Sequence, residues 1–326
     1  MGRAMILVAG EALYDLFVEG EQGNTLSLEA RPGGSPFNVA VGLARLSQPV
    51  AFFGGVSQDF LGQRLLRLLE AEGIDARFVR HRRQPTTLSL VGLAPDGSPA
   101  YGFYGEGADR AIDAAEIPPL PAGLRALHLG SYSTVAEPVG TALESLLRRN
   151  PGIPLVSYDP NVRLGVEPDI WIWRRKFASL LPFVHLLKIS LEDFKLLFPG
   201  ADPAELAGSW LKKGPRLVVI TRGPEGAQGF TAAATAAVPA VAVSVVDTVG
   251  AGDSYQAALL AGLAEAGRLD ADSVTGLSAA DLGNLLALAG AAAAITCSRR
   301  GADMPRRAEL PPHDAVDLFF RSPRPK

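Results

Sequence analysis

The feature that most constrains the fold is a regular alternation of short apolar runs with helical patterns. Six runs are bounded by turn residues and predict buried strands: 5–10, 50–56, 126–130, 154–159, 184–189 and 216–221. Helical patterns lie near residues 36–46, 59–72, 136–149, 191–198 and 203–213. This alternation predicts an α/β fold with a mainly parallel sheet and helices on both of its faces.

Two segments depart from this alternation. Residues 11–32 and 87–108 alternate apolar with polar residues around turn-forming residues. The second segment contains Pro95-Asp96-Gly97, which predicts the turn of a β-hairpin. We expect both segments to form a small β-flap, or lid, outside the main sheet.

The composition limits the class of protein. The chain has 326 residues, 48% of them hydrophobic, so it can bury the core of one large α/β domain or two smaller ones. The net charge of −3 and the lack of a basic cluster argue against nucleic acid as a partner. A single cysteine, Cys297, excludes an internal disulfide and fits a reducing compartment.

The sequence also argues against a membrane protein. We expect no apolar run to approach the roughly 20 residues that span a bilayer. The apolar N-terminal stretch is interrupted by Glu11 and Asp15, so MILVA reads as a first buried strand and not as part of a signal peptide. We therefore expect a soluble, cytoplasmic protein.

A glycine-rich turn at the start of a helical pattern carries the strongest chemical signal. Gly250, Ala251 and Gly252 lead directly into Asp253, and an apolar run at helical spacing follows. A helix N-terminus has unpartnered N–H groups and a positive partial charge, and glycines let another molecule approach its backbone. The turn thus suits an anion such as a phosphate. Asp253 either complements the helix dipole or accepts a proton from a hydroxyl that attacks a phosphoryl group.

Other nucleotide-binding and metal motifs are absent. No Gly-Lys pair occurs in the chain, so there is no P-loop. The first strand is followed by GEAL, with one glycine, which excludes a dinucleotide fingerprint at that place. The histidines are far apart in the sequence and do not have metal-ligand spacing.

Several motifs resemble those of one family. DTVGAGD at 247–253 is similar to the C-terminal signature of the ribokinase-like, or PfkB, carbohydrate kinases, and PGGSPFNVAVGLARL at 32–46 resembles their N-terminal signature. Further matching segments follow the family's order over nearly the whole chain: GEALYDLF (10–17), YDPNVR (158–163), KIS (188–190), TRGPEG (221–226) and SRRGA (298–302). Bacterial fructokinases are the most similar members, and 2-keto-3-deoxygluconate kinases come second.

The resemblance implies a ribokinase-like three-layer α/β/α sandwich. Residues 1–326 would form a single kinase domain, with the lid segments 11–32 and 87–108 inserted in it. The implied reaction transfers the γ-phosphoryl group of ATP to a sugar hydroxymethyl group, with fructose as the first candidate acceptor. 2-Keto-3-deoxygluconate, ribose and nucleosides are alternative acceptors, and a non-catalytic sugar or nucleotide sensor is an alternative of another class.

The resemblance also assigns roles to residues of the reaction and of the sugar site. Asp253 would act as the base, the amides of Gly250, Ala251 and Gly252 as the anion hole, and Arg163 would reach the phosphoryl group or the sugar. Sugar contacts would come from Asp15, Gly33, Gly34, Asn38 and the lid aromatics Tyr101 and Phe103. Ser35 would cap the helix and Pro36 would suit its first position. Structural roles stay open for Asp15 as a turn residue, Arg163 in a salt bridge and the aromatics in a dimer interface.

The nucleotide and ion sites follow from the same resemblance. ATP would contact Ser190, Thr221, Arg222, Gly223, Gly226, Gly252 and Gly290. The family's Asn-x-x-Glu motif reads Ser190-x-x-Asp193 here, so either Asp193 or Glu192 would hold Mg²⁺ through water. Asp247, Val249 and Gly301 would hold a monovalent cation such as K⁺, and the lid would support a homodimer.

Overall fold

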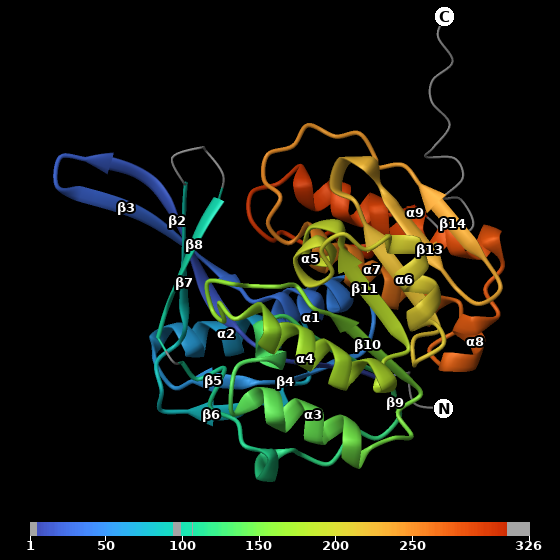
Figure 1. The fold of residues 1–326 in the computed structure, drawn as a ribbon. Coiled ribbons are helices and arrows are strands. Elements are labelled where there is room, and N and C mark those ends of the chain that lie inside the picture. Colours follow the sequence, from blue (N-terminus) through green and yellow to red (C-terminus); the bar gives the residue numbers. More distant parts are fainter. Residues whose placement is uncertain (1–4, 94–98, 106, 312–326) are drawn as a thin grey trace, which may run out of the picture.

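The computed structural model describes residues 5–93, 99–105 and 107–311. Its centre is an eight-stranded sheet (Figure 1). The strand order is β14 (Thr235–Val238), β13 (Ala227–Phe230), β12 (Leu217–Thr221), β11 (Leu186–Ser190), β10 (Leu155–Asp159), β9 (Leu124–Gly130), β1 (Met5–Ala9) and β4 (Val50–Phe53). Neighbouring strands from β12 to β4 are parallel, and only β13 and β14 pair antiparallel at one edge. The prediction of a mainly parallel sheet is confirmed.

Helices cover both faces of this sheet. In β1, Ile6 and Val8 point into one core and Leu7 and Ala9 into the other, as the two-residue period of a strand requires. The first core is closed by α1 (Ser35–Arg45), α2 (Phe60–Ala71), α7 (Ala251–Glu265), α8 (Ala271–Thr275) and α9 (Ala279–Cys297). The second is closed by α3 (Val139–Arg149), α4 (Ile170–Leu180), α5 (Leu191–Leu197) and α6 (Pro203–Trp210). The expected three-layer α/β/α sandwich is therefore confirmed.

The two lid segments form a separate four-stranded sheet, as predicted. Its order is β3 (Thr25–Gly33), β2 (Leu13–Gln22), β7 (Leu88–Leu93) and β8 (Pro99–Tyr104). Figure 1 shows this sheet projecting from one side of the sandwich. The predicted turn at 95–97 lies outside the described residues. Because β2 and β7 pair in parallel, segments far apart in the sequence build one lid.

Several elements differ from the sequence prediction. The run 50–56 is two strands, β4 and β5 (Gly55–Ser57), and β5 pairs with β6 (Arg80–Arg82). They separate at Gly54, where a Cβ would lie 2.4 Å from the Gly10 carbonyl oxygen, so the chain passes very close to the end of β1. Sequence analysis did not assign α4, which is rich in aromatic residues typical of strands. Asp169 starts this helix by accepting a hydrogen bond from the Trp171 amide.

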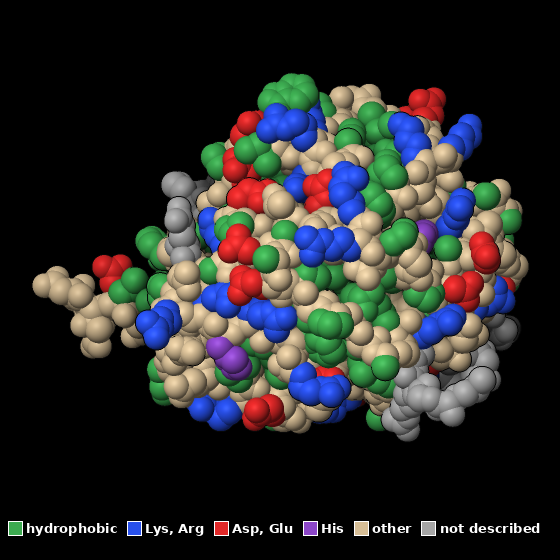
Figure 2. Space-filling model, turned by 90° about the horizontal axis from the view of Figure 1, so that it is seen from below, with side chains coloured by type: hydrophobic (Ala, Val, Ile, Leu, Met, Phe, Trp, Pro, Cys, Tyr) green, Lys and Arg blue, Asp and Glu red, His purple; other side chains and the backbone are tan. Residues whose placement is uncertain are grey.

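Helix α9 corrects the expectation about apolar runs. It has 19 residues and is apolar enough to cross a membrane by length and composition, so the expectation that no run approaches this length was wrong. In the fold α9 is a core helix, because Leu282, Leu286 and Ala289 are buried in the same core as α7. On the molecular face in Figure 2, side chains of both charges are interspersed with apolar ones.

Candidate active site

The predicted site residues gather at the carboxyl edge of the parallel sheet. Asp159, Ser190 and Thr221 are the last residues of the adjacent strands β10, β11 and β12. The N-terminus of α7 reaches the same edge, because a Cβ on Gly252 would lie 3.3 Å from Lys188 Nζ of β11, and side chains at the start of α1 are hydrogen-bonded to Asp253 of α7. Ligands of open α/β sheets bind at this edge.

Asp253 is buried at the first turn of α7, with 8% of its surface exposed. Its Oδ1 accepts a hydrogen bond from Ser35 Oγ at 2.6 Å, and its Oδ2 accepts one from Asn38 Nδ2 at 2.9 Å. Burial raises the pKa of this carboxyl, while both hydrogen bonds oppose that change. The carboxylate is therefore fixed in direction, and its pKa is higher than that of a solvated helix-start aspartate.

Ser35 of α1 differs from the prediction, and Asn38 makes a contact that was not predicted. Gly34, with φ 100°, is the N-cap of α1 and makes no side-chain cap, so Ser35 does not cap the helix. The hydroxyl of Ser35 instead reaches across to Asp253. Asn38 was predicted to meet a sugar hydroxyl, and in this structure its amide nitrogen also orients Asp253. Pro36 lies in the first turn of α1, as expected.

The start of α7 has the backbone that the glycine-rich motif predicted. Gly250 is the N-cap in the left-handed region, with φ 79°, and a Cβ there would lie 2.6 Å from Ala302 Cβ. A residue with a side chain is thus disfavoured by both conformation and space. The amide of Ala251 donates to the Thr248 carbonyl at 3.2 Å and closes the turn. The amides after it, from Gly252 onward, begin the first helical turn, and Gly252 is exposed.

Asp15 lies against the glycine pair that precedes α1. A Cβ on Gly33 would sit 2.1 Å from Asp15 Oδ2, and a Cβ on Gly34 would sit 2.8 Å from the Glu11 carbonyl oxygen. Burial raises the pKa of Asp15 to about 6, and the negative charge of Asp253 adds to the rise. Arg163 opposes it with its positive charge, so this guanidinium also belongs to the site. Asp15 of the predicted sugar site and the predicted base Asp253 therefore lie close enough for their charges to interact.

The lid contributes Phe103 from β8. Its ring meets Tyr132 edge-on, with the ring centroids 5.7 Å apart. Phe103 is only partly buried, which leaves part of its ring available to a ligand. Tyr101 pairs with Val91 in the lid sheet, but its side chain lies outside the described residues.

The predicted nucleotide residues follow β12 and lie on α9. After Thr221, the 3₁₀ turn Gly223–Glu225 has Gly223 at φ 53° and is followed by Gly226 at φ 93°. Arg222 donates to Gln228 Oε1 at 2.7 Å, which places its side chain along β13. A Cβ on Gly290 would meet no atom within 4 Å, so this face of α9 is open. Ser190 caps α5 by accepting the Asp193 amide at 3.0 Å.

Of the two candidate magnesium residues, Asp193 faces the site. It is buried, whereas Glu192 is exposed. The amide of Val162 donates to Asp193 Oδ1 at 3.1 Å, and burial together with the charge of Asp159 raises the pKa of Asp193 to about 6. Among the described residues, no group of three or more His, Cys, Asp or Glu side chains could hold a metal alone. One or two carboxylates fit Mg²⁺, which keeps several waters and binds substrate phosphates.

The residues of the predicted monovalent-cation site are brought together by Asp247. Its Oδ1 accepts the Val249 amide at 3.0 Å and its Oδ2 accepts the Gly301 amide at 2.8 Å. Two loops distant in the sequence therefore meet at one carboxylate.

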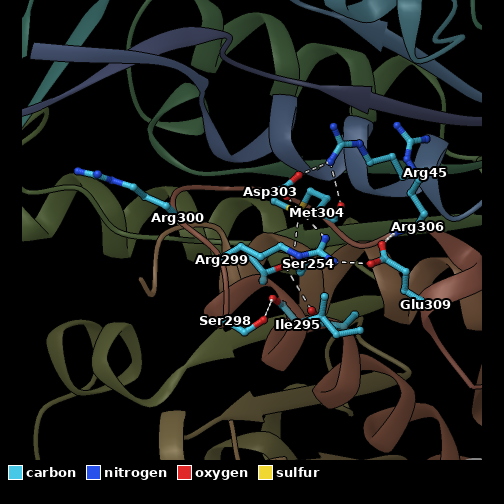
Figure 3. Close-up of polar contacts among 12 residues, drawn as sticks. Arg45, Ser254, Ile295, Ser298, Arg299, Arg300, Asp303, Met304, Arg306 and Glu309 are labelled. Carbon is cyan, nitrogen blue, oxygen red and sulfur yellow. Dashed lines mark hydrogen bonds and ion pairs between the residues drawn. The ribbon is translucent and has the colours of Figure 1, made fainter. Parts of the chain in front are cut away.

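The loop after α9, residues 298–306, is hydrogen-bonded to α1 and to the lid. Figure 3 shows Arg45 of α1 reaching Asp303 and Met304, with Nη1 at 2.7 Å from Asp303 Oδ1 and 2.9 Å from the Met304 carbonyl oxygen. Arg300 points away from this group in Figure 3. It forms an ion pair with Glu19 of β2, and its carbonyl oxygen accepts a hydrogen bond from Arg31 of β3. The loop thus contacts the lid.

Sequence analysis assigned no role to the ion pair between Lys188 of β11 and Asp159 of β10. Lys188 Nζ lies 2.5 Å from Asp159 Oδ2, and each side chain is only 3% exposed. A signal was present, because the run 184–189 predicts a buried strand and lysine is almost never fully buried without a partner. A cavity of about 520 Å³ lies elsewhere, between α3 and α4 beside Glu144 and Lys176.

Glu11 is a second buried acid near the sugar-site glycines. It is 1% exposed, and burial raises its pKa from 4.5 to about 7. The folded protein therefore holds the proton more tightly than the unfolded chain, so the free energy of unfolding falls as the pH rises from 4.5 to 7.

We expect Glu11→Gln, which mimics the protonated acid, to remove this loss. At pH 8 the variant should be more stable than the native chain by about 3 kcal/mol, and at pH 4 the two should agree. Urea unfolding at several pH values measures the difference. Glu70→Gln, at an exposed position of α2, is the control. Parallel pH dependences for the native chain and Glu11→Gln would contradict the prediction.

Comparisons with known proteins agree with this geometry. The sequence pattern of the pfkB family carbohydrate kinases matches residues 3–308. A fructokinase from Rhizobium leguminosarum bv. trifolii is 38% identical over 260 residues, which cover 79% of each chain.

Solved structures have the same fold. Fructokinase from Vibrio cholerae O395, with fructose, ADP and a calcium ion, has a TM-score of 0.80 and 26% identity, over 98% of this chain and 99% of that one. Its double mutant was solved with fructose, ADP and a potassium ion. A putative ribokinase II from E. coli, with ATP and Mg²⁺, has a TM-score of 0.79 at 22% identity, over 98% and 99% of the two chains. Because the family pattern covers residues 3–308, the chain belongs to the pfkB family and is a carbohydrate kinase.

Proposed function

We propose that the protein is an ATP-dependent sugar kinase whose acceptor is fructose and whose product is fructose 6-phosphate. The observation that carries the proposal is the position of Asp253. It is buried at the helix N-terminus of α7, oriented by Ser35 and Asn38, and close enough to Asp15 to raise the pKa of that carboxyl. A sugar held by Asp15 would present a hydroxyl to Asp253.

The proposed reaction is an in-line transfer. Asp253 accepts the proton of the sugar hydroxymethyl group, and the sugar oxygen forms a bond to the γ-phosphorus of ATP. The bond from that phosphorus to the β,γ-bridging oxygen breaks, and ADP leaves. Amides of the first turn of α7 stabilise the negative charge on the transferring group, which is where phosphoryl transfer needs help. Phe103 and the lid limit access of water, a competing acceptor.

Two ion sites complete the proposal. Asp193 holds Mg²⁺ through water, because it is the buried acid of its pair and lies beside Asp159 and Arg163. The ion supplies positive charge to the phosphates. Asp247, Val249 and Gly301 hold K⁺, since Asp247 joins the two loops. Thr221, Arg222, Gly223 and Gly226 contact the nucleotide, and Gly290 leaves room beside it. Ser190 acts there by fixing α5 and hence Asp193.

The choice of fructose rests on the similarity to proteins named fructokinases. The test is ADP release with fructose, 2-keto-3-deoxygluconate, ribose and nucleosides, each at matched concentration. We expect the highest kcat/KM with fructose. A higher value with another acceptor would reassign the substrate within the family, and sugar binding without ADP release would indicate a sensor.

We also propose that residues 1–326 work as one kinase domain in the cytoplasm, and that two copies pair through their lids. The lid exposes Val18, Leu26 and Leu28, which are 41%, 50% and 44% exposed. Apolar residues gathered on one projecting sheet favour an interface. Sedimentation velocity should give a dimer at micromolar concentration, and a monomer there would contradict the pairing.

A further inference from the structure

The ion pair of Lys188 and Asp159 is placed where charge is costly. Both side chains are 3% exposed, and a buried lysine is stable only with a close, hydrogen-bonded partner. The two residues come from neighbouring strands, so the sheet itself fixes their separation. Asp159 Oδ1 has no hydrogen-bond partner among the described residues. The positions of both charges are therefore fixed by the sheet, and one carboxylate oxygen of Asp159 makes no hydrogen bond within the described residues.

The ammonium lies beside the first turn of α7. A Cβ built on Gly252 would lie 3.3 Å from Lys188 Nζ, and apart from its chain neighbours and its own helix backbone no other atom of the described residues comes within 4 Å of it. Gly252 immediately precedes Asp253, so the lysine borders the proposed base. Absence of a side chain at residue 252 is what lets the ammonium approach the helix so closely.

The proposed base stands among charges of both signs. Asp15 projects from β2, and the charge of Asp253 raises its pKa, whereas Arg163, which follows β10, lowers the pKa of both Asp15 and Asp193 of α5. Asp247 lies in the loop before α7 and adds a further negative charge near Asp15. His128 of β9 is buried, and burial together with the charge of Lys188 lowers its pKa to about 3, so it is neutral at neutral pH. Acids outnumber the two cations here.

The two members of the ion pair act on Asp253 in opposite directions. Burial is the largest cause of the raised pKa of Asp253. The ammonium of Lys188 lowers that pKa and the carboxylate of Asp159 raises it. Without the positive charge of Lys188, burial and the negative charge of Asp159 would therefore raise the pKa of Asp253 further.

We propose that Lys188 is a positioning residue for phosphoryl transfer: its ammonium, held by Asp159 against the first turn of α7, keeps the Asp253 carboxylate in the form that accepts a proton. This role rests on the proposed function of Asp253 as base. Asp159 sets the position of the ammonium, and the bare backbone of Gly252 admits it. The pair thus adjusts the base without contacting the sugar.

The test reads the protonation of Asp253 directly. Aspartate labelled with ¹³C at the carboxyl carbon is titrated by NMR in the whole ligand-free protein, and the Asp253 signal is identified by its loss in Asp253→Asn. In Lys188→Met we expect the titration midpoint to move to higher pH by about one unit, as loss of a close opposite charge predicts. In Asp159→Asn, which keeps an oxygen for the lysine, we expect it to move to lower pH.

The opposite signs separate an electrostatic role from a structural one. General loosening of the site would move both midpoints toward the ordinary aspartate value and so in one direction. If Lys188→Met does not fold, an unchanged or higher midpoint in Asp159→Asn still overturns the proposal. Lys176→Met breaks a comparable pair with Glu144, at 3.0 Å, on the other side of the sheet and should leave the midpoint unchanged.

A rate measurement links the result to the reaction. The single-turnover rate of phosphoryl transfer at pH 7 should fall about tenfold in Lys188→Met, with its acid limb displaced in the same direction as the NMR midpoint. A native enzyme that transfers no phosphoryl group to any sugar would refute the proposed function, while the NMR titration would still support or overturn the effect of Lys188 on Asp253.

Discussion

Replacing Asp253 with Asn is expected to lower kcat by about 10²- to 10⁴-fold. The amide has nearly the same shape but cannot accept the proton of the attacking hydroxyl. Its oxygen can keep the hydrogen bond from Ser35, whereas its nitrogen would face the donor nitrogen of Asn38. We therefore expect a folded protein whose ATP affinity is close to native. Steady-state kinetics with fructose, and nucleotide binding by calorimetry, measure the two properties.

A matched control separates catalysis from helix stabilisation. Asp202 also lies at a helix start, where its side chain accepts the amides of Ala204 and Glu205 in α6. Asp202→Asn should cost at most about 1 kcal/mol of stability and leave turnover unchanged. Near-native turnover in Asp253→Asn, or an equal loss in both variants, would remove Asp253 from the reaction.

Replacing Asp15 with Ala is expected to raise KM for the sugar by about 10²-fold while KM for ATP changes by less than about twofold. The carboxylate lies against Gly33, where backbone is bare and a sugar ring can approach it. Without the Asp15 carboxylate, sugar hydroxyls that would donate to it have no hydrogen-bond partner in a partly buried site, so the sugar binds more weakly. KM values for both substrates, measured with the other one saturating, give the comparison.

The pH dependence of sugar binding gives a second view of the same residue. Because the pKa of Asp15 is raised to about 6, the acid gains its proton as the pH falls below 6, and sugar affinity should weaken over that range. The dependence should be absent in Asp15→Ala. Glu21→Ala, at an exposed position farther along β2, should change neither KM. Equal rises in both KM values for Asp15→Ala would contradict its assignment to the sugar site.

The sequence predicted the sandwich well because its signals are local. Strand β1 shows a buried apolar run, and helices α1 and α2 lie where helical patterns near 36–46 and 59–72 predicted them. Helix α4 was not assigned because its local composition favours a strand and its helical state depends on packing of Trp173 and Phe177 in the core. The lid was predicted as a small β-flap of two segments, the second a hairpin, but the parallel pairing of β2 with β7 depends on tertiary contacts.

The site was predictable where a motif fixes the backbone and less so where side chains meet across the fold. Gly250 and Gly34 have positive φ values, which glycine adopts without strain. Ser35 and Asp253 are 218 positions apart, and no local pattern distinguishes a capping hydroxyl from one that reaches another helix. Lys188 was visible as a charge in an apolar strand, but its partner Asp159 emerges only from the strand order.

The contact of Arg300 with the lid has a thermodynamic consequence. The same loop carries Gly301, which Asp247 ties to the loop before α7, while Arg300 is paired with Glu19 and lies 3.6 Å from Glu29. If the proposed function holds, a rearrangement of the lid around the sugar would disturb this loop and, through Asp247, the start of α7, where the nucleotide's terminal phosphate is proposed to lie. Thermodynamic linkage then requires that bound sugar changes the affinity for the nucleotide by the same factor by which bound nucleotide changes the affinity for the sugar. Because the contact between the loop and the lid is ionic, high salt should reduce both factors together.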